Sequence, residues 1–208
     1  MPSSKYERVI WDADGVLIDS RQVAWDSARE IVSLFHPVAQ INTREDYLSH
    51  FSIQRQIALV GEEESKTLRA MHRLLMRHRS ERSKVIEEVI RIARLLTIPS
   101  VIVTSAFAEG IRRILGVNVQ IFEDISGREI DRKSDLLPHT AAKSRSVYIT
   151  DSGKDIETCH AINLDSVGVG WGYYAFDEIE AANPTFSVST PHELRKLFSQ
   201  LGLISKGG

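Results

Sequence analysis

Two carboxylates stand one residue apart near the start of the chain, directly after an apolar run at residues 9–11. They are Asp12 and Asp14, and Gly15 follows them. Side chains of a strand alternate between its two faces, so the two acids would share a face and could serve one metal or one substrate. Gly15 lets the chain turn away at once. The pattern places both acids at the carboxyl end of a buried strand, where open α/β sheets bind ligands.

Polar residues also follow two later apolar runs. Thr104 and Ser105 end the first of these runs, and either hydroxyl could hold an anionic oxygen. Asp151 ends the second, and Asp155 follows it at the start of an expected helix. Lys133 stands between the two runs, just ahead of another helix. Together with the first two acids, these residues describe a hard-cation site beside a phosphate site.

The elements that position these residues alternate between strand and helix, which predicts an α/β fold with a Rossmann-like parallel sheet. Apolar runs predict strands at residues 6–11, 100–104, 119–122, 146–149, 166–169 and 185–188. Helical periodicity predicts helices between them at residues 109–115, 135–142, 154–162, 177–182 and 191–201.

One long block breaks this alternation and carries almost no strand signal. Its apolar spacing predicts helices at residues 20–35, 63–79 and 84–96. We therefore expect a catalytic core formed by residues 1–19 and 98–208, with residues 20–97 inserted after the first strand as a helical domain.

Composition narrows the function classes. The chain has 208 residues, is 42% hydrophobic and carries a formal net charge of −2, so we expect neither nucleic acid nor an anionic membrane as a partner. A lone cysteine, Cys159, forms no internal disulfide, and no secretory signal or membrane-spanning run is visible. A cytoplasmic location is the default expectation, and the oligomeric state stays open.

The polar residues, taken in order, resemble the motifs of the haloacid dehalogenase-like superfamily of phosphatases and relatives. Residues 12–17 match its first motif, Thr104 its second, Lys133 its third, and Asp151 with Asp155 its fourth. The resemblance covers residues 5–20 and 98–201, and the tail at residues 168–173 looks most like the phosphoglycolate-phosphatase-like branch. In that superfamily an insertion after the first motif forms a helical cap.

The resemblance implies a phosphatase that works through an aspartyl-phosphate. Asp12 would attack phosphorus, while Asp14 would protonate the leaving oxygen and later deprotonate the hydrolytic water. Thr104 and Lys133 would bind the phosphoryl oxygens, with Ser105 as the rival for the hydroxyl role.

A magnesium ion is implied as the cofactor. The Asp12 carboxylate, the Asp14 backbone carbonyl and Asp151 would hold it, and Asp155 would orient a metal-bound water or Lys133. The expected substrate is a small phosphorylated metabolite.

Two departures from the motifs stand out. Thr150 occupies the position where the family usually has glycine before the fourth-motif acid, and Ala13 fills a slot often taken by a bulky apolar residue. Neither position supplies a charged catalytic group, so we expect activity to survive.

Single residues argue against three rival classes of enzyme. Asp14 argues against dehalogenases and phosphonatases. A β-phosphoglucomutase-like enzyme would carry a histidine where this chain aligns Ala24, which weakens the mutase alternative. A non-catalytic binding protein that keeps the fold is the second alternative.

Arginines recur at one-turn spacing in the insertion, at Arg69, Arg73 and Arg77. They could form a cationic face for an anionic substrate. They could instead be a solvated face opposite the apolar stripe of the same helix, paired with nearby glutamates, and this second interpretation is the favoured one.

Overall fold

The computed structural model describes residues 4–35, 43, 45–47, 60–128 and 133–205. The chain divides into two compact units. The first comprises Met1–Asp19 and Lys84–Gly208, and the second comprises Ser20–Ser83. The contacts thus group residues 84–97 with the sheet, whereas the expected division at residue 97 assigned them to the insertion. The physical reason is that α5 (Glu87–Arg94) buries its apolar side chains in the core beside the sheet.

A six-stranded parallel sheet is the centre of the first unit. Its strand order is β5-β4-β1-β6-β7-β8, and every neighbouring pair is parallel. The strands are β1 (Arg8–Trp11), β4 (Ser100–Val103), β5 (Asp124–Ser126), β6 (Ser146–Thr150), β7 (Asp165–Val169) and β8 (Phe186–Val188). The predicted α/β fold is confirmed.

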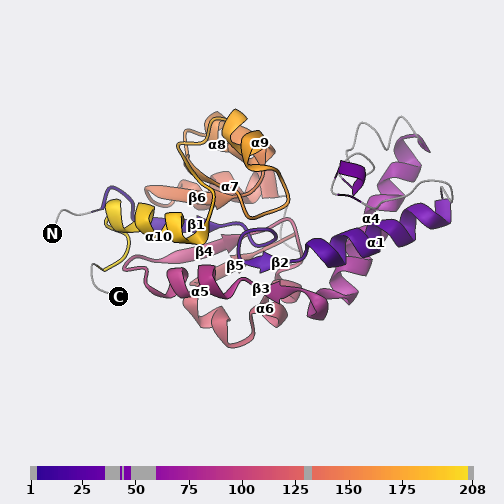
Figure 1. Cartoon of the computed structure of the whole chain (residues 1–208), viewed down its shortest axis with the longest axis horizontal. Coiled ribbons are helices and arrows are strands. Elements are labelled where there is room, and N and C mark those ends of the chain that lie inside the picture. The colour runs from indigo at the N-terminus through magenta and orange to yellow at the C-terminus, as the bar shows by residue number, and fades with distance from the viewer. Residues whose placement is uncertain (1–3, 36–42, 44, 48–59, 129–132, 206–208) are drawn as a thin grey trace. The chain divides into compact units, whose positions relative to one another are not determined.

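Helices cover both faces of this sheet, as Figure 1 shows. On one face lie α7 (Lys133–Ala141), α8 (Gly153–Ala161) and α9 (Phe176–Ala181). On the other lie α5, α6 (Ala108–Leu115) and α10 (Pro191–Gln200). A parallel sheet needs such cover because its strands are buried on both faces.

The alternation of side chains along β1 explains the two hydrophobic cores. Val9 and Trp11 point into the core shared with α5, α6 and α10, whereas Ile10 points into the core shared with α7 and α8. Trp11 meets Phe198 of α10 edge-on, with ring centroids 5.8 Å apart. All of these side chains are fully buried.

The predicted strand at residues 119–122 is wrong. Residues Gly116–Ile121 form a 3-10 helix (η2), and the strand of this region comes later, as β5. Val117 is 80% exposed, whereas Ile125 is 2% exposed and pairs with Ile102 of β4. A short apolar run does not distinguish strand from helix, and burial against β4 chose the later segment.

The predicted helix start at Lys84 is also wrong. Lys84–Val85 form β3, which pairs antiparallel with β2 (Ile18–Asp19). The two short strands lie where the chain leaves the first unit and returns to it. Pairing between segments so far apart in the sequence leaves no signal in local periodicity.

The second unit contains α1 (Arg21–Phe35), α4 (Glu62–His78) and the 3-10 helix η1 (Ser80–Arg82). Within it, α1 packs on α4, and Arg79 forms an ion pair with Glu30. Near the start of α4, Glu62 and Glu63 form ion pairs with Lys66. Within the expected insertion, most of the stretch from residue 36 to residue 59 lies outside the described residues. In the described part of the chain, no helix has the length and apolar character needed to cross a membrane.

We expect Phe198→Ala to lower the free energy of unfolding by about 3–5 kcal/mol, because it leaves a cavity against Trp11. Urea denaturation of the whole chain measures this loss. Val117→Ala is the matched control, since Val117 is 80% exposed and its truncation should change stability by less than about 0.5 kcal/mol. Equal losses for the two variants would contradict the assignment of Phe198 to the core.

Candidate active site

A tight loop after β1 presents Asp12 at the carboxyl end of the sheet. The Asp12 amide still belongs to the ladder and donates to the Ile149 carbonyl at 2.9 Å. The chain then folds back, because the amides of Leu17 and Ile18 both donate to the Ala13 carbonyl, at 2.9 and 3.0 Å. The Ala13 amide donates to Asp12 Oδ1 at 2.8 Å, which fixes the carboxylate relative to its own backbone.

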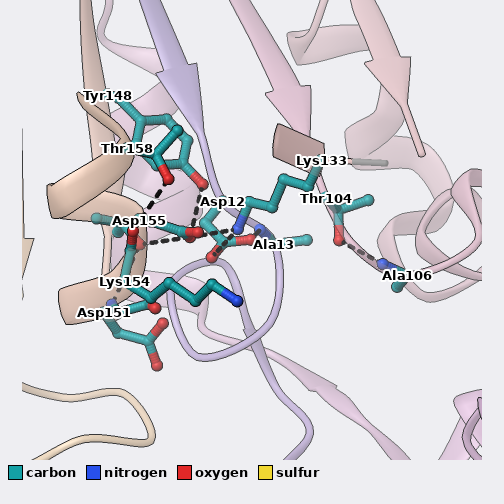
Figure 2. Close-up of polar contacts among 12 residues, drawn as sticks. Asp12, Ala13, Thr104, Ala106, Lys133, Tyr148, Asp151, Lys154, Asp155 and Thr158 are labelled. Atoms are coloured by element: carbon teal, nitrogen blue, oxygen red, sulfur yellow. Dashed lines mark hydrogen bonds and ion pairs between the residues drawn. The ribbon is translucent and has the colours of Figure 1, made fainter. Parts of the chain in front are cut away.

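Lys133 joins two of the predicted acids. Its Nζ lies 2.6 Å from Asp12 Oδ2 and 2.6 Å from Asp155 Oδ2. The side chains of Lys133, Asp12 and Asp155 are only 13, 8 and 18% exposed. Figure 2 shows the lysine entering from α7 between the carboxylate after β1 and the carboxylate of α8.

Burial and the neighbouring charges together set the pKa values of this group. Burial raises the pKa of Asp12 to about 8, with the charge of Lys133 opposing the shift and the neighbouring acids Asp155 and Asp151 adding to it. Burial alone would lower the pKa of Lys133, but the charges of Asp12 and Asp155 outweigh it and raise that pKa. Lys133 is therefore held as an ammonium ion.

Asp151, at the end of β6, lies against two backbone segments that carry glycine. Its Oδ2 accepts a hydrogen bond from the Tyr173 amide at 2.6 Å. A Cβ placed on Gly15 or on Gly172 would lie 2.0 or 2.2 Å from that oxygen, so both positions require glycine. Burial raises the pKa of Asp151 to about 6, and the Tyr173 amide opposes the shift.

Asp155 is held by three side chains through one oxygen. Besides Lys133, the hydroxyls of Thr150 and Tyr148 donate to Asp155 Oδ2, at 3.1 and 3.2 Å. Burial alone would raise the pKa of Asp155, but the charge of Lys133 and these hydrogen bonds lower it. Asp155 is therefore an ionised partner of Lys133 at neutral pH.

The remaining predicted residues lie at the same end of the sheet. Thr104 follows β4 and is fully buried, and its hydroxyl accepts from the Ala106 amide at 3.1 Å, whereas Ser105 is exposed. Asp14 is half-buried and bridges to Ile18 through its backbone. Hydrogen bonds thus join Asp12, Lys133 and Asp155. The charge of Asp151 acts on Asp12, and the charge of Asp14 acts on Asp151.

Solved structures with this arrangement of strands and helices identify the fold. A "predicted phosphatase" from Clostridium acetobutylicum matches with a TM-score of 0.79 at 21% identity, over 95% of this chain and 100% of that one. A haloacid dehalogenase-like family hydrolase from Streptococcus pneumoniae matches with a TM-score of 0.75 at 14% identity, over 93 and 99%. The chain has the haloacid dehalogenase-like fold. The fold expected from the motifs is confirmed.

A protein tyrosine kinase shares this haloacid dehalogenase-like fold and is also similar in sequence. Tyrosine-protein kinase PtkA of Mycobacterium tuberculosis is 29% identical in an alignment 229 residues long. The alignment covers 94% of this chain and 73% of PtkA. The structure of PtkA matches with a TM-score of 0.73 at 24% identity, over 96% of this chain and 100% of that one. No family model matches the chain.

The donor set fits a hard divalent cation, the group implied by this fold. Asp12 and Asp151 are buried carboxylates. The negative charges of Asp155 and Asp151 raise the pKa of Asp12, and those of Asp155 and Asp14 raise the pKa of Asp151. Oxygen ligands and unbalanced negative charge favour Mg²⁺. Within the described ranges, no three His, Cys, Asp or Glu side chains stand close enough to enclose an ion by themselves. Backbone carbonyl and water ligands would therefore have to complete the coordination.

Sequence reasoning missed several residues that shape the site. By sequence alone, Tyr148 is one member of an apolar run that predicts a buried strand, and Thr150 is only a departure from the usual glycine. Their period-two spacing on β6 places them on one face, which was the available signal. The contact between Tyr173 and Asp151 had no such signal, because it joins separate segments of the chain.

We expect Gly15→Ala to destabilise the protein and to displace Asp151, because the new methyl group would collide with its carboxylate at 2.0 Å. The matched control is Gly116→Ala. Gly116 also has a positive φ, +55° against +77° for Gly15, but open space around its Cβ position. Urea denaturation should show a loss of about 1–3 kcal/mol for the control from backbone strain and a larger loss for Gly15→Ala. Equal losses would contradict the close approach of Gly15 to Asp151.

Proposed function

We propose that this protein is a magnesium-dependent phosphatase that hydrolyses a small phosphorylated metabolite through an aspartyl-phosphate. The observation that carries the proposal is the pair formed by Asp12 and Lys133. A buried carboxylate at the carboxyl end of β1, held by an ammonium ion at 2.6 Å, is a positioned nucleophile beside a positive charge suited to phosphoryl oxygens. The tail at residues 168–173 looks most like the phosphoglycolate-phosphatase-like branch, and this resemblance supports a small phosphate ester as the substrate.

In the first step, an Asp12 carboxylate oxygen attacks phosphorus, and the bond from phosphorus to the leaving oxygen breaks. Asp14 gives its proton to that oxygen. In the second step, Asp14 takes a proton from water, which attacks the phosphorus and releases inorganic phosphate from Asp12. General acid–base help of this kind contributes roughly 10²–10⁴-fold.

Lys133 stabilises the charge that develops on the transferring phosphoryl group. Its ammonium already lies against Asp12, so it needs little movement as the phosphoryl group arrives. Thr104 supplies a hydroxyl at the end of β4, beside β1, and its burial favours it over the exposed Ser105 for this role.

Mg²⁺ would be held by the Asp12 carboxylate, the Asp14 backbone carbonyl and Asp151. When bound, it supplies positive charge that favours the ionised form of Asp12 and reduces repulsion between that carboxylate and the phosphate. Asp155 keeps Lys133 in place beside this group.

Asp12→Asn tests the nucleophile. We expect hydrolysis of p-nitrophenyl phosphate to fall below about 10⁻³ of the wild-type rate, because an amide does not attack phosphorus. Asp177→Asn is the matched control, since Asp177 is an exposed acid in the first turn of α9 and should keep wild-type activity. Wild-type rates for Asp12→Asn would rule out the assigned nucleophile.

Metal removal tests the cofactor. We expect EDTA to abolish hydrolysis and added Mg²⁺ to restore it, because the buried carboxylates need a compensating cation. The rate is followed by release of p-nitrophenol, then by release of phosphate from a panel of phosphorylated metabolites. Full activity in EDTA would argue against a metal. Isomerisation of a sugar phosphate without phosphate release would identify a mutase, and no turnover of any ester would favour a binding protein.

Transfer of phosphate to tyrosine is a second candidate function, favoured by the 29% identity to PtkA across most of both chains. In that reaction a tyrosine hydroxyl, losing its proton to a base, would attack the γ-phosphorus of ATP, and the bond to the β,γ-bridging oxygen would break to release ADP. Incubation with Mg²⁺, radiolabelled ATP and a tyrosine-containing peptide separates the two functions. Stable phosphotyrosine would support the kinase, whereas release of phosphate from small esters without labelled peptide supports the phosphatase.

A further inference from the structure

One oxygen of Asp155 collects three donors, and two of them belong to residues with no role in the proposed reaction. Tyr148 and Thr150 donate to Asp155 Oδ2 at 3.2 and 3.1 Å, beside Lys133 at 2.6 Å. Figure 2 shows Tyr148 of β6 and Lys133 of α7 beside this carboxylate.

Both hydroxyls are fixed in the core. Tyr148 and Thr150 are each 0% exposed, and their spacing puts them on the same face of β6. The Thr150 hydroxyl also accepts from the Ser152 amide at 3.2 Å, which ties it to the turn before α8. The Tyr148 ring lies 5.5 Å from the Lys133 ammonium, so this residue contacts both members of the ion pair.

A buried hydroxyl can form hydrogen bonds only with the groups packed around it, so the fold determines its direction. Glycine at position 150 would offer no hydroxyl, and phenylalanine at position 148 would leave the ring without its donor. Two neutral donors on Asp155 Oδ2 share that oxygen with Lys133, and they limit how strongly Asp155 draws the ammonium away from Asp12.

We propose that Tyr148 and Thr150 are positioning residues that hold Asp155, and through it set the Lys133 ammonium against Asp12. The inference rests on the proposed phosphoryl-transfer function. Without the two hydroxyls, Asp155 Oδ2 keeps only Lys133 among these three donors, and the ammonium moves toward it. Misplacing a catalytic group by about 1 Å lowers the rate by up to about 10²-fold. The two hydroxyls should therefore affect stabilisation of the transition state by Lys133.

Tyr148→Phe and Thr150→Val test this role, because each removes a hydroxyl and keeps the volume. We expect kcat for p-nitrophenyl phosphate with Mg²⁺ to fall about tenfold in each, with KM changed by less than about twofold. Thr150→Ser keeps the hydroxyl and should restore most of the lost kcat. Thr158→Val is the matched control, since its hydroxyl donates to the Lys154 carbonyl within α8, and its kcat should match wild type.

A double-mutant cycle with Asp155 distinguishes this positioning role from a purely structural one. If the two residues act through Asp155, then adding Tyr148→Phe to Asp155→Asn should lower kcat by less than about twofold. Additive losses, or losses that follow the melting temperature of each variant, would overturn the inference. So would unchanged kcat in Tyr148→Phe and Thr150→Val when the wild type is active.

If the wild type hydrolyses no ester, the proposed function is overturned. The positioning role of the two hydroxyls is then tested by a measurement that needs no turnover. The Lys133 ammonium, held by two carboxylates, should give a slowly exchanging lysine NζH₃ signal in NMR, assigned by its loss in Lys133→Ala. We expect this signal to shift and exchange faster in the combined Tyr148→Phe and Thr150→Val variant, and to be unaltered in Thr158→Val. An identical signal in all three proteins would show that the hydroxyls do not position Lys133.

Discussion

The site depends on an ammonium ion held out of water between two carboxylates. Removing Lys133 and its partners from solvent is costly, and the ion pairs with Asp12 and Asp155 at 2.6 Å offset that cost only if the geometry is maintained. Every element around the group contributes to that geometry. The loop after β1 fixes Asp12, the first turn of α7 supplies Lys133, and the start of α8 supplies Asp155.

The parallel sheet makes this convergence possible. Because β4, β1 and β6 are neighbours and run in one direction, the residues that follow them emerge at one edge. Close packing at that edge demands glycine where the backbone meets Asp151, at Gly15 and Gly172. The same strands place Tyr148 and Thr150 beneath the carboxylates, so the polar site is continuous with the buried core rather than laid on its surface.

The fold by itself does not choose the reaction. Proteins named as phosphatases and one named as a tyrosine kinase share this architecture with the chain. What all of these names have in common is phosphoryl chemistry, and a buried carboxylate beside an ammonium ion is suited to that step whatever the acceptor. The Asp12 and Lys133 pair by itself does not distinguish water from tyrosine as the acceptor.

The sequence by itself determined the fold class and the residues that carry charge at the site. The apolar run into Asp12 and the alternation of strands and helices are local patterns, so they could be read without coordinates. Local patterns failed at residues 119–122 and at Lys84, where pairing with distant strands chose the structure. Only the tertiary structure decided that one oxygen of Asp155 binds Lys133, Tyr148 and Thr150 together, because those contacts depend on how separate segments pack rather than on residue type or spacing.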